Sequence, residues 1–116
     1  MKGNANSHLI LDGKAGQPTV RVQATTLEDL AEKLPAPTLV KIDVEGAELG
    51  IFNAGDSLLK KKEVTFLVEL HPWAYPEYKS DFERLLSKLD AYGRKVSLLD
   101  DRKKPADLPF YGSIIF

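Results

Sequence analysis

The sequence predicts an α/β fold with a mostly parallel sheet and an antiparallel strand at its C-terminal end. Three observations support this prediction. Strand-like and helix-like segments alternate along the chain, two of the strand-like segments are apolar over most of their length, and the last two are joined by a connection too short for a helical crossover. Alternation at this spacing is typical of right-handed βαβ crossovers between parallel strands. A connection without a crossover helix favours antiparallel pairing.

Size and composition limit the possible functions. The chain has 116 residues, of which 16 are basic and 17 acidic, and 43% are hydrophobic. These values suit a single domain over residues 1–116, with a loose N-terminal segment at 1–18. The balanced charge argues against a nucleic-acid partner, and the absence of cysteine excludes a disulfide framework, a thiol nucleophile and a cysteine zinc site. No apolar run approaches the roughly 20 residues of a membrane span, and we expect a cytoplasmic protein.

The first third of the chain predicts two short strands and a helix. Residues 8–11 form a brief apolar run among turn-forming residues. Residues 20–24 alternate apolar and polar side chains, which predicts a strand with one face in solvent. Thr25 and Glu28 have the spacing of a capping box, so a helix should begin there and end before Pro35.

The middle of the chain predicts a central strand and an interrupted helix. Residues 38–44 are mostly apolar and β-branched, which is typical of a strand buried on both faces. A helix is expected over residues 47–62. It should break near Gly55 and begin again with Asp56 or Ser57 as its cap.

The remaining elements follow the same reasoning. Residues 64–70 form a second strand of the buried type. Residues 77–92 give the clearest helix, because apolar side chains recur at helical spacing and Gly93 suits the position after the helix end. Short strands are expected at residues 95–99 and at residues 110–116.

Acidic residues and one histidine follow the two apolar strands. Asp43 and Glu45 come after the first strand, and Glu69 and His71 come at the end of the second. Ligands of open α/β sheets bind outside the carboxyl ends of the strands, so these groups should converge at a site. Gly46 would permit a tight turn or a close approach to a ligand. Simpler alternatives are that Asp43 or Glu45 caps the next helix, that Glu69 is paired or solvent-facing, and that His71 is an ordinary loop residue.

Three short motifs point to a known family. The run Lys-Ile-Asp-Val-Glu-Gly-Ala-Glu at 41–48 is the longest. A Thr-Leu-Glu-Asp-Leu helix start at 26–30 precedes it, with Glu28 where an Asp is usual, and Val-Glu-Leu-His at 68–71 follows it. On these motifs, the chain resembles the FkbM-type family of S-adenosylmethionine-dependent methyltransferases over roughly residues 19–100.

The resemblance implies a Rossmann-like class I methyltransferase sheet and the transfer of a methyl group from S-adenosylmethionine to an acceptor, typically an oxygen. The acceptor would be a hydroxyl of a small molecule, a sugar or a lipid. The resemblance assigns Asp43 and Gly46 to the cofactor, and Glu45, Glu69 and His71 to catalysis beside the acceptor. Because an acceptor hydroxyl must lose its proton, His71 or a carboxylate would act as general base.

The chain also departs from the family pattern. Residues 1–37 contain neither the glycine-rich turn nor the acid-ended strand that hold the cofactor in such methyltransferases. We therefore expect the chain to represent the C-terminal half of the fold, a truncated domain that is incomplete in isolation. The sheet edge that the missing strands would cover should favour self-association or pairing with a partner chain.

Two other functions remain open at this point. One is a non-catalytic α/β binding or assembly module that keeps the scaffold without the reaction. The other is a divalent-metal enzyme that uses Asp43, Glu45 and Glu69 as oxygen ligands. The preferred assignment includes no metal ligand, and its expected partner is a small-molecule acceptor.

Overall fold

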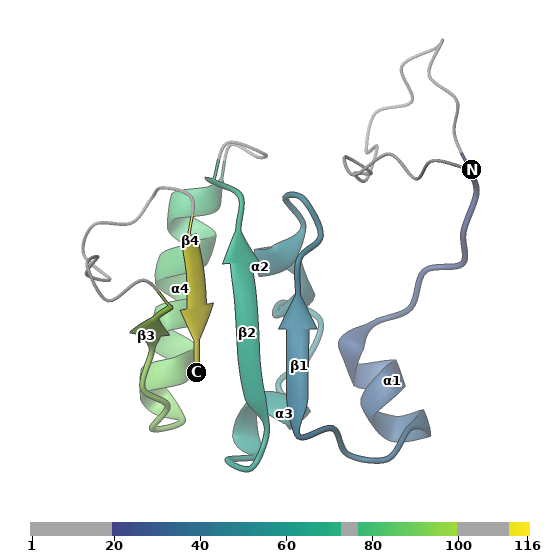
Figure 1. Ribbon diagram of the computed structural model, residues 1–116, viewed down its shortest axis with the longest axis horizontal. Coiled ribbons are helices and arrows are strands. Elements are labelled where there is room, and N and C mark those ends of the chain that lie inside the picture. Colours follow the sequence, from purple (N-terminus) through teal and green to yellow (C-terminus); the bar gives the residue numbers. More distant parts are fainter. Residues whose placement is uncertain (1–19, 73–76, 100–111) are drawn as a thin grey trace, which may run out of the picture.

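The computed structural model describes residues 20–72, 77–99 and 112–116. The strand predicted at 8–11 and the connection at 100–109 lie outside these residues. The described elements are α1 (Leu27–Lys33), β1 (Leu39–Ile42), α2 (Glu48–Ile51), α3 (Ser57–Lys60), β2 (Thr65–Leu70), α4 (Tyr78–Ala91), β3 (Ser97–Leu98) and β4 (Gly112–Ile115) (Figure 1). No helix in this described part is long and apolar enough to cross a membrane.

The strands form one mixed sheet in the order β1-β2-β4-β3. β1 and β2 pair in parallel, whereas β4 pairs antiparallel with both β2 and β3. The antiparallel C-terminal strand is therefore confirmed. The prediction of a mostly parallel sheet is wrong for the described strands, because β4 lies between β2 and β3 and makes both of those pairings antiparallel.

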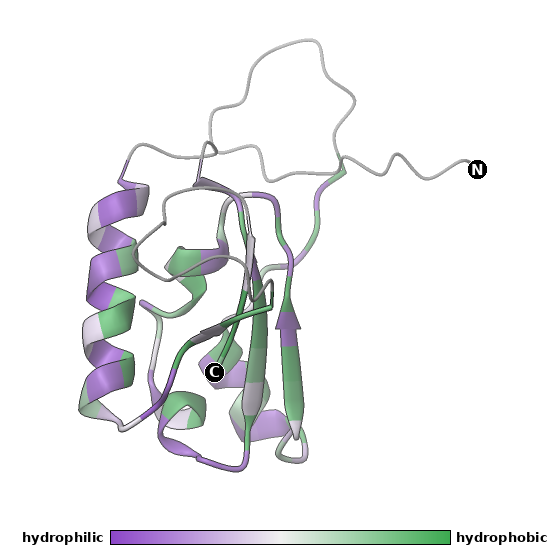
Figure 2. Cartoon of the chain, turned by 60° about the vertical axis from the view of Figure 1, so that its left-hand side comes forward, coloured by the Kyte–Doolittle hydropathy of each residue, from purple (hydrophilic) through white to green (hydrophobic). Residues whose placement is uncertain are grey.

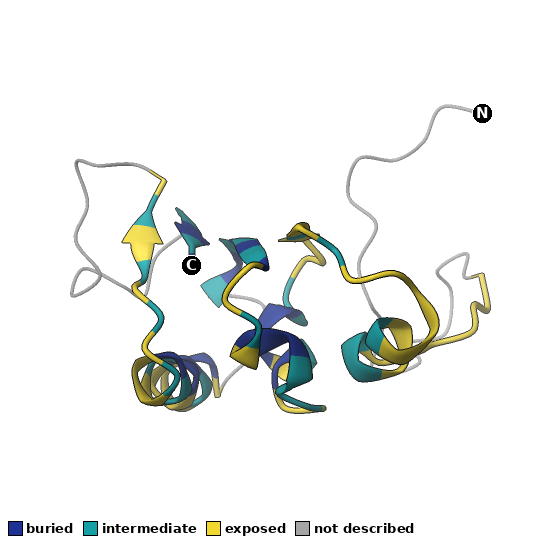
Figure 3. Cartoon of the chain, turned by 90° about the horizontal axis from the view of Figure 1, so that it is seen from below, coloured by how far each residue is buried: buried dark blue, intermediate teal, exposed yellow. Residues whose placement is uncertain are grey.

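The helices lie on one side of the sheet and enclose the core against it (Figure 3). Three aromatic rings occupy the centre of this core, with Phe66 5.7 Å from Phe52 and 5.2 Å from Phe116 between centroids. The buried apolar residues are Ile42, Leu49, Phe52, Leu58, Leu59, Val64, Phe66, Val68, Leu70, Tyr78, Phe82, Leu85, Leu89, Ile114 and Phe116. Burial of this apolar surface is the main favourable contribution to folding.

The long helix α4 is confirmed, and its composition explains its position. Tyr78, Phe82, Leu85 and Leu89 recur at three- and four-residue spacing and are buried. Figure 2 shows the hydrophobic residues of α4 on one side of the helix and the hydrophilic residues on the other. Gly93 follows the helix with a φ of 66°, as its predicted place after the helix end requires.

β1 is not the central strand that its composition predicts. It lies at one edge of the described sheet, and only Val40 and Ile42 turn toward the helices, while Leu39 is 57% exposed. An apolar run indicates that a strand can be buried but not what lies beside it, which explains the error. Pairing of this edge with another copy or with a partner chain stays a prediction.

The strand predicted at 20–24 is wrong as well. These residues have no regular structure, and Val20 and Val22 are 86% and 76% exposed. Two-residue alternation describes how a strand would face its surroundings, but a strand also needs a neighbour for its backbone hydrogen bonds.

The predicted helix start is confirmed, but its cap differs by one residue. Thr26 caps α1, and its Oγ1 accepts a hydrogen bond from the backbone N–H of Asp29 at 3.0 Å. The capping box predicted between Thr25 and Glu28 does not form. The Glu28 carboxylate instead accepts from the backbone N–H of Ser57 at 3.2 Å, which stabilises the amino end of α3 and ties α1 to it.

The predicted break near Gly55 is confirmed, since α2 ends at Ile51 and α3 begins at Ser57. Asp56 occupies the N-cap position, but its side chain does not cap α3. Its carboxylate accepts hydrogen bonds from Tyr92 Oη at 2.6 Å and from Lys88 Nζ at 3.0 Å, both on or beside α4. These bonds lower the pKa of Asp56 below its ordinary value of 3.8, the bond from Tyr92 first.

Arg94 closes the connection between α3 and β2. Its guanidinium donates to the carbonyl oxygens of Leu59 at 2.6 Å and Val64 at 2.9 Å, and also to those of Leu58 and Lys61. The same group lies 5.5 Å from the ring centroid of Phe66. The planar fork of an arginine suits this arrangement, because several carbonyls converge on one group. Arg94 therefore holds the start of β2 in place.

Replacing Arg94 with methionine is expected to lower the free energy of unfolding by about 2 kcal/mol, because carbonyl groups turned toward it lose their donor. Arg84→Met is the matched control, since Arg84 is exposed and pairs with Asp81 at 3.0 Å one turn earlier on α4. Its effect should stay below about 1 kcal/mol. Urea unfolding of both variants measures the difference, and equal losses would contradict the role given to Arg94.

The Asp56 contacts predict a pH dependence of stability. Because the folded-state pKa of Asp56 is lowered, its contribution is complete above the unfolded-state pKa and is lost as the pH falls through the folded-state pKa. Asp56→Asn should therefore cost about 1 kcal/mol at pH 7 and progressively less below pH 4. Urea unfolding at several pH values tests this, with Asp90→Asn on the exposed side of α4 as control. A difference independent of pH would contradict the assignment.

Candidate functional site

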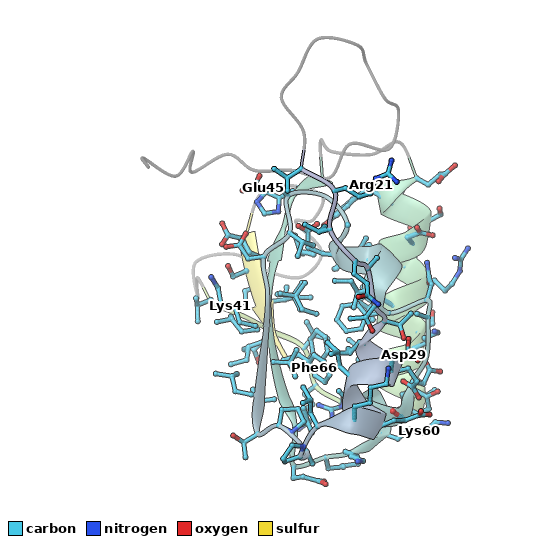
Figure 4. The ribbon with its side chains drawn as sticks, turned by 90° about the vertical axis from the view of Figure 1, so that its right-hand side faces the viewer. Arg21, Asp29, Lys41, Glu45, Lys60 and Phe66 are labelled. Carbon is cyan, nitrogen blue, oxygen red and sulfur yellow. The ribbon has the colours of Figure 1, made fainter. Side chains whose placement is uncertain are left out.

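The parallel pairing of β1 and β2 brings their carboxyl ends together. Ile42 pairs with Val68, so the next residues in the same register are Asp43 and Glu69. In Figure 4, Lys41 projects from the sheet face away from the helices, Phe66 lies between the sheet and the helices, and Glu45 lies beyond the end of β1. Because side chains alternate along a strand, Asp43 and Glu69 belong to the same open face as Lys41.

His71 joins these two carboxylates. Asp43, Glu69 and His71 each offer one ligand-type atom, and these atoms lie within 4.8 Å of one another. Asp43 is exposed, Glu69 is half-buried and His71 is only 3% exposed. The structure thus brings together the residues that were expected to converge from two separate strand ends.

A fourth acidic residue, Glu48, completes the site from the opposite side. Its side chain is fully buried at the start of α2, and its Oε1 lies 2.7 Å from His71 Nδ1. The same oxygen accepts a hydrogen bond from the backbone N–H of Gly46 at 2.9 Å. With the ring proton on Nδ1, His71 donates to Glu48 Oε1, and its Nε2 faces Glu45 Oε2 at 3.6 Å.

Sequence reasoning did not assign Glu48 a role, although the residue closes the 41–48 motif. A charged residue at the beginning of a helix normally indicates an exposed side chain that suits the helix dipole. The signal that could have identified Glu48 is its position in the motif, three residues after Glu45.

A tight turn connects β1 to α2. Glu45 has a φ of 54° and Gly46 a φ of 119°, so both lie in the left-handed region. The value at Gly46 favours glycine, as predicted, whereas the value at Glu45 costs of order 1 kcal/mol. This turn leads the chain from β1 into α2, whose first residue, Glu48, lies 2.7 Å from His71.

The helix-capping alternative for Asp43 and Glu45 is not what the structure shows. Ala47 is the N-cap of α2, and no side chain makes a cap hydrogen bond there. Asp43 Oδ2 instead lies 3.2 Å from Lys41 Nζ, and Glu45 Oε2 lies 3.6 Å from His71 Nε2. Both carboxylates therefore remain at the edge of the sheet, where a ligand could reach them.

The site carries an excess of negative charge. Asp43, Glu45, Glu48 and Glu69 surround His71, and within the described part of the chain the exposed Lys41 pairs with Asp43. Burial, followed by the charge of Glu48, raises the pKa of nearby Tyr78 to about 12, so its hydroxyl stays protonated. Among the described residues, Glu48 Oε2 is buried without a hydrogen-bond partner. This charge distribution favours a bound cation or a cationic ligand.

Comparison with known families gives a match over most of the chain. A family model described as the methyltransferase FkbM domain matches residues 3–96. No curated protein and no solved structure matches the chain. The matched range begins before α1 and includes β1, β2, α4 and all of the site residues described above. The chain therefore belongs to the FkbM methyltransferase family, whose members use S-adenosylmethionine.

Proposed function

We propose that this chain takes part in O-methyl transfer from S-adenosylmethionine to a hydroxyl group of a small molecule, a sugar or a lipid. The observation that carries the proposal is the buried pair of Glu48 and His71, 2.7 Å apart, at the edge where β1 and β2 end. A buried carboxylate that holds an imidazole ring is the usual way in which a protein prepares a histidine for proton transfer.

The residues present suit a cationic cofactor. S-adenosylmethionine carries a sulfonium and an ammonium group, and the described end of the sheet has an excess of carboxylates. Asp43, exposed after β1, and the backbone of the turn at Gly46 are the groups that would hold it. When bound, the cofactor supplies an electrophilic methyl carbon, whose bond to sulfur breaks as its bond to the acceptor oxygen forms.

The acceptor hydroxyl must give up its proton as the new bond forms. Two groups at the site are suited to take it, His71 Nε2 and Glu45 Oε2, which lie 3.6 Å apart. Glu48 fixes the ring through Nδ1 and stabilises the imidazolium if the proton remains on His71. We assign proton acceptance to this pair of His71 and Glu45.

Glu69 is assigned to the orientation of the acceptor. It lies on the open face of β2, half-buried beside Asp43 and His71. A carboxylate there can accept a hydrogen bond from a neighbouring hydroxyl of the acceptor. In-line displacement depends strongly on alignment, so such a contact would raise the rate without taking part in bond formation.

Binding of the demethylated product is the first test. Calorimetric titration of S-adenosylhomocysteine into the full chain is expected to give micromolar binding. Asp43→Asn should weaken that binding about tenfold, because a carboxylate facing the cofactor loses its charge. Glu83→Gln on the exposed side of α4 is the matched control. A folded chain that does not bind the product would contradict the proposal and favour the non-catalytic binding or assembly module.

Substitution of the buried pair tests the chemistry separately. His71→Ala is expected to lower kcat by about 10²–10⁴-fold while the affinity for S-adenosylhomocysteine changes little, since proton transfer contributes that much. Glu48→Gln keeps one acceptor oxygen for the contacts with Gly46 and His71 but removes the charge, and should lower kcat about tenfold or more. Transfer of a labelled methyl group to a panel of hydroxyl compounds provides the measurement. An unchanged kcat in His71→Ala would rule out its role in proton transfer.

A further inference from the structure

We propose that Asp43, Glu69 and His71 form a binding site for a divalent transition-metal ion at the carboxyl ends of β1 and β2. One ligand-type atom from each residue lies within 4.8 Å of the others. Metal–ligand distances of about 2.0–2.2 Å place ligand atoms roughly 3–4 Å apart, so a small movement closes the set around an ion. The exposed Asp43 side chain has the freedom for that movement.

The donor types indicate the class of ion. Two carboxylate oxygens and one imidazole nitrogen form a mixed set of hard and intermediate donors. Carboxylates alone would suit Mg²⁺ or Ca²⁺, whereas an added imidazole favours Mn²⁺ or Zn²⁺. Three protein ligands leave further coordination positions for water or a substrate oxygen, as in catalytic sites.

The contact between Glu48 and His71 is an independent observation that supports the site. Histidine ligands of metals almost always donate their second ring N–H to a carboxylate or a carbonyl, which fixes the tautomer and aims the other nitrogen at the ion. Glu48 Oε1 lies 2.7 Å from His71 Nδ1, and both side chains are more than nine-tenths buried. Because this contact orients the His71 ring, the cluster of Asp43, Glu69 and His71 is arranged as a metal site and differs from a chance group of surface acids.

Charge gives a second reason for a cation. Four carboxylates lie around one imidazole, and Glu48 Oε2 is buried without a hydrogen-bond partner among the described residues. A buried carboxylate is costly unless a positive charge compensates for it. A divalent ion beside His71 would supply that charge, and the open face at Asp43 gives it access from solvent.

The role of the ion rests on the proposed function. An ion that holds the acceptor hydroxyl makes its proton easier to remove and aligns its oxygen. Because His71 Nε2 would then bind the ion, the proton would pass to Glu45, whose Oε2 lies 3.6 Å from Nε2. With the ion bound, Glu45 is therefore the proton acceptor of the two residues.

The experiment uses the full chain, from which metal has been removed with EDTA followed by dialysis. MnCl2 and ZnCl2 are titrated into it by calorimetry, and Mn²⁺ binding is also followed by electron paramagnetic resonance. The chain has two histidines, so a His8→Ala background leaves His71 as the one imidazole. We expect one ion per chain. Asp43→Asn and Glu69→Gln should each weaken binding about tenfold or more, and Glu48→Gln about 10–100-fold. Circular dichroism checks that each variant folds, and Glu83→Gln should bind as the parent does.

Two outcomes overturn the site: a folded parent that binds neither ion, or Asp43→Asn and Glu69→Gln variants that bind as tightly as the parent. Titration of S-adenosylhomocysteine in EDTA separates this result from the proposed function. If the chain binds S-adenosylhomocysteine but no metal, the metal site is refuted and the methyl-transfer proposal stands. If it binds metal but not S-adenosylhomocysteine, the methyl-transfer proposal is refuted and the metal site stands. A Glu45→Gln variant that keeps the ion but loses methyl transfer would support the role given to Glu45.

Discussion

The hydrogen bond between Glu48 and His71 is the contact on which the carboxyl edge of the sheet depends. It joins the start of α2 to the end of β2, and both of its side chains are buried. α2 has only four residues, too few to be stable by its own backbone hydrogen bonds. Its position therefore depends on tertiary contacts such as this one. Loss of either partner would leave the other as an uncompensated buried polar group, which is strongly destabilising.

The same contact explains why the chain tolerates a strained turn. Glu45 has a positive φ at a cost of order 1 kcal/mol, and the turn is closed by the bond from Gly46 N–H to Glu48 Oε1. A single carboxylate oxygen thus holds both the turn and the imidazole. This arrangement places Glu45 and Asp43 at the open edge instead of at the helix terminus, so their charges are directed to a ligand.

What could be predicted from the sequence depended on whether the deciding contact was local. The convergence of Asp43, Glu69 and His71 followed from two parallel strands that end at one edge, and the start of α1 followed from its threonine cap. The burial of Glu48 could not be predicted, because it depends on where the turn at Gly46 sends the chain. The exposure of Leu39 could not be predicted either, since an apolar run does not tell which strands lie beside it.

One end of the sheet carries contacts that stabilise the fold, and the other end carries the candidate site. At the amino end of β2, Arg94 is matched to converging carbonyl oxygens, and Asp56 is matched to Lys88 and Tyr92. At the carboxyl end, carboxylates gather around one imidazole with an excess of negative charge. Proteins pair their structural charges because unpaired ones are costly, so an uncompensated group that persists in a fold generally belongs to a site that binds something. In this chain that excess lies at the strand ends, where the uptake of a proton from the acceptor and the binding of a cation would both be favoured.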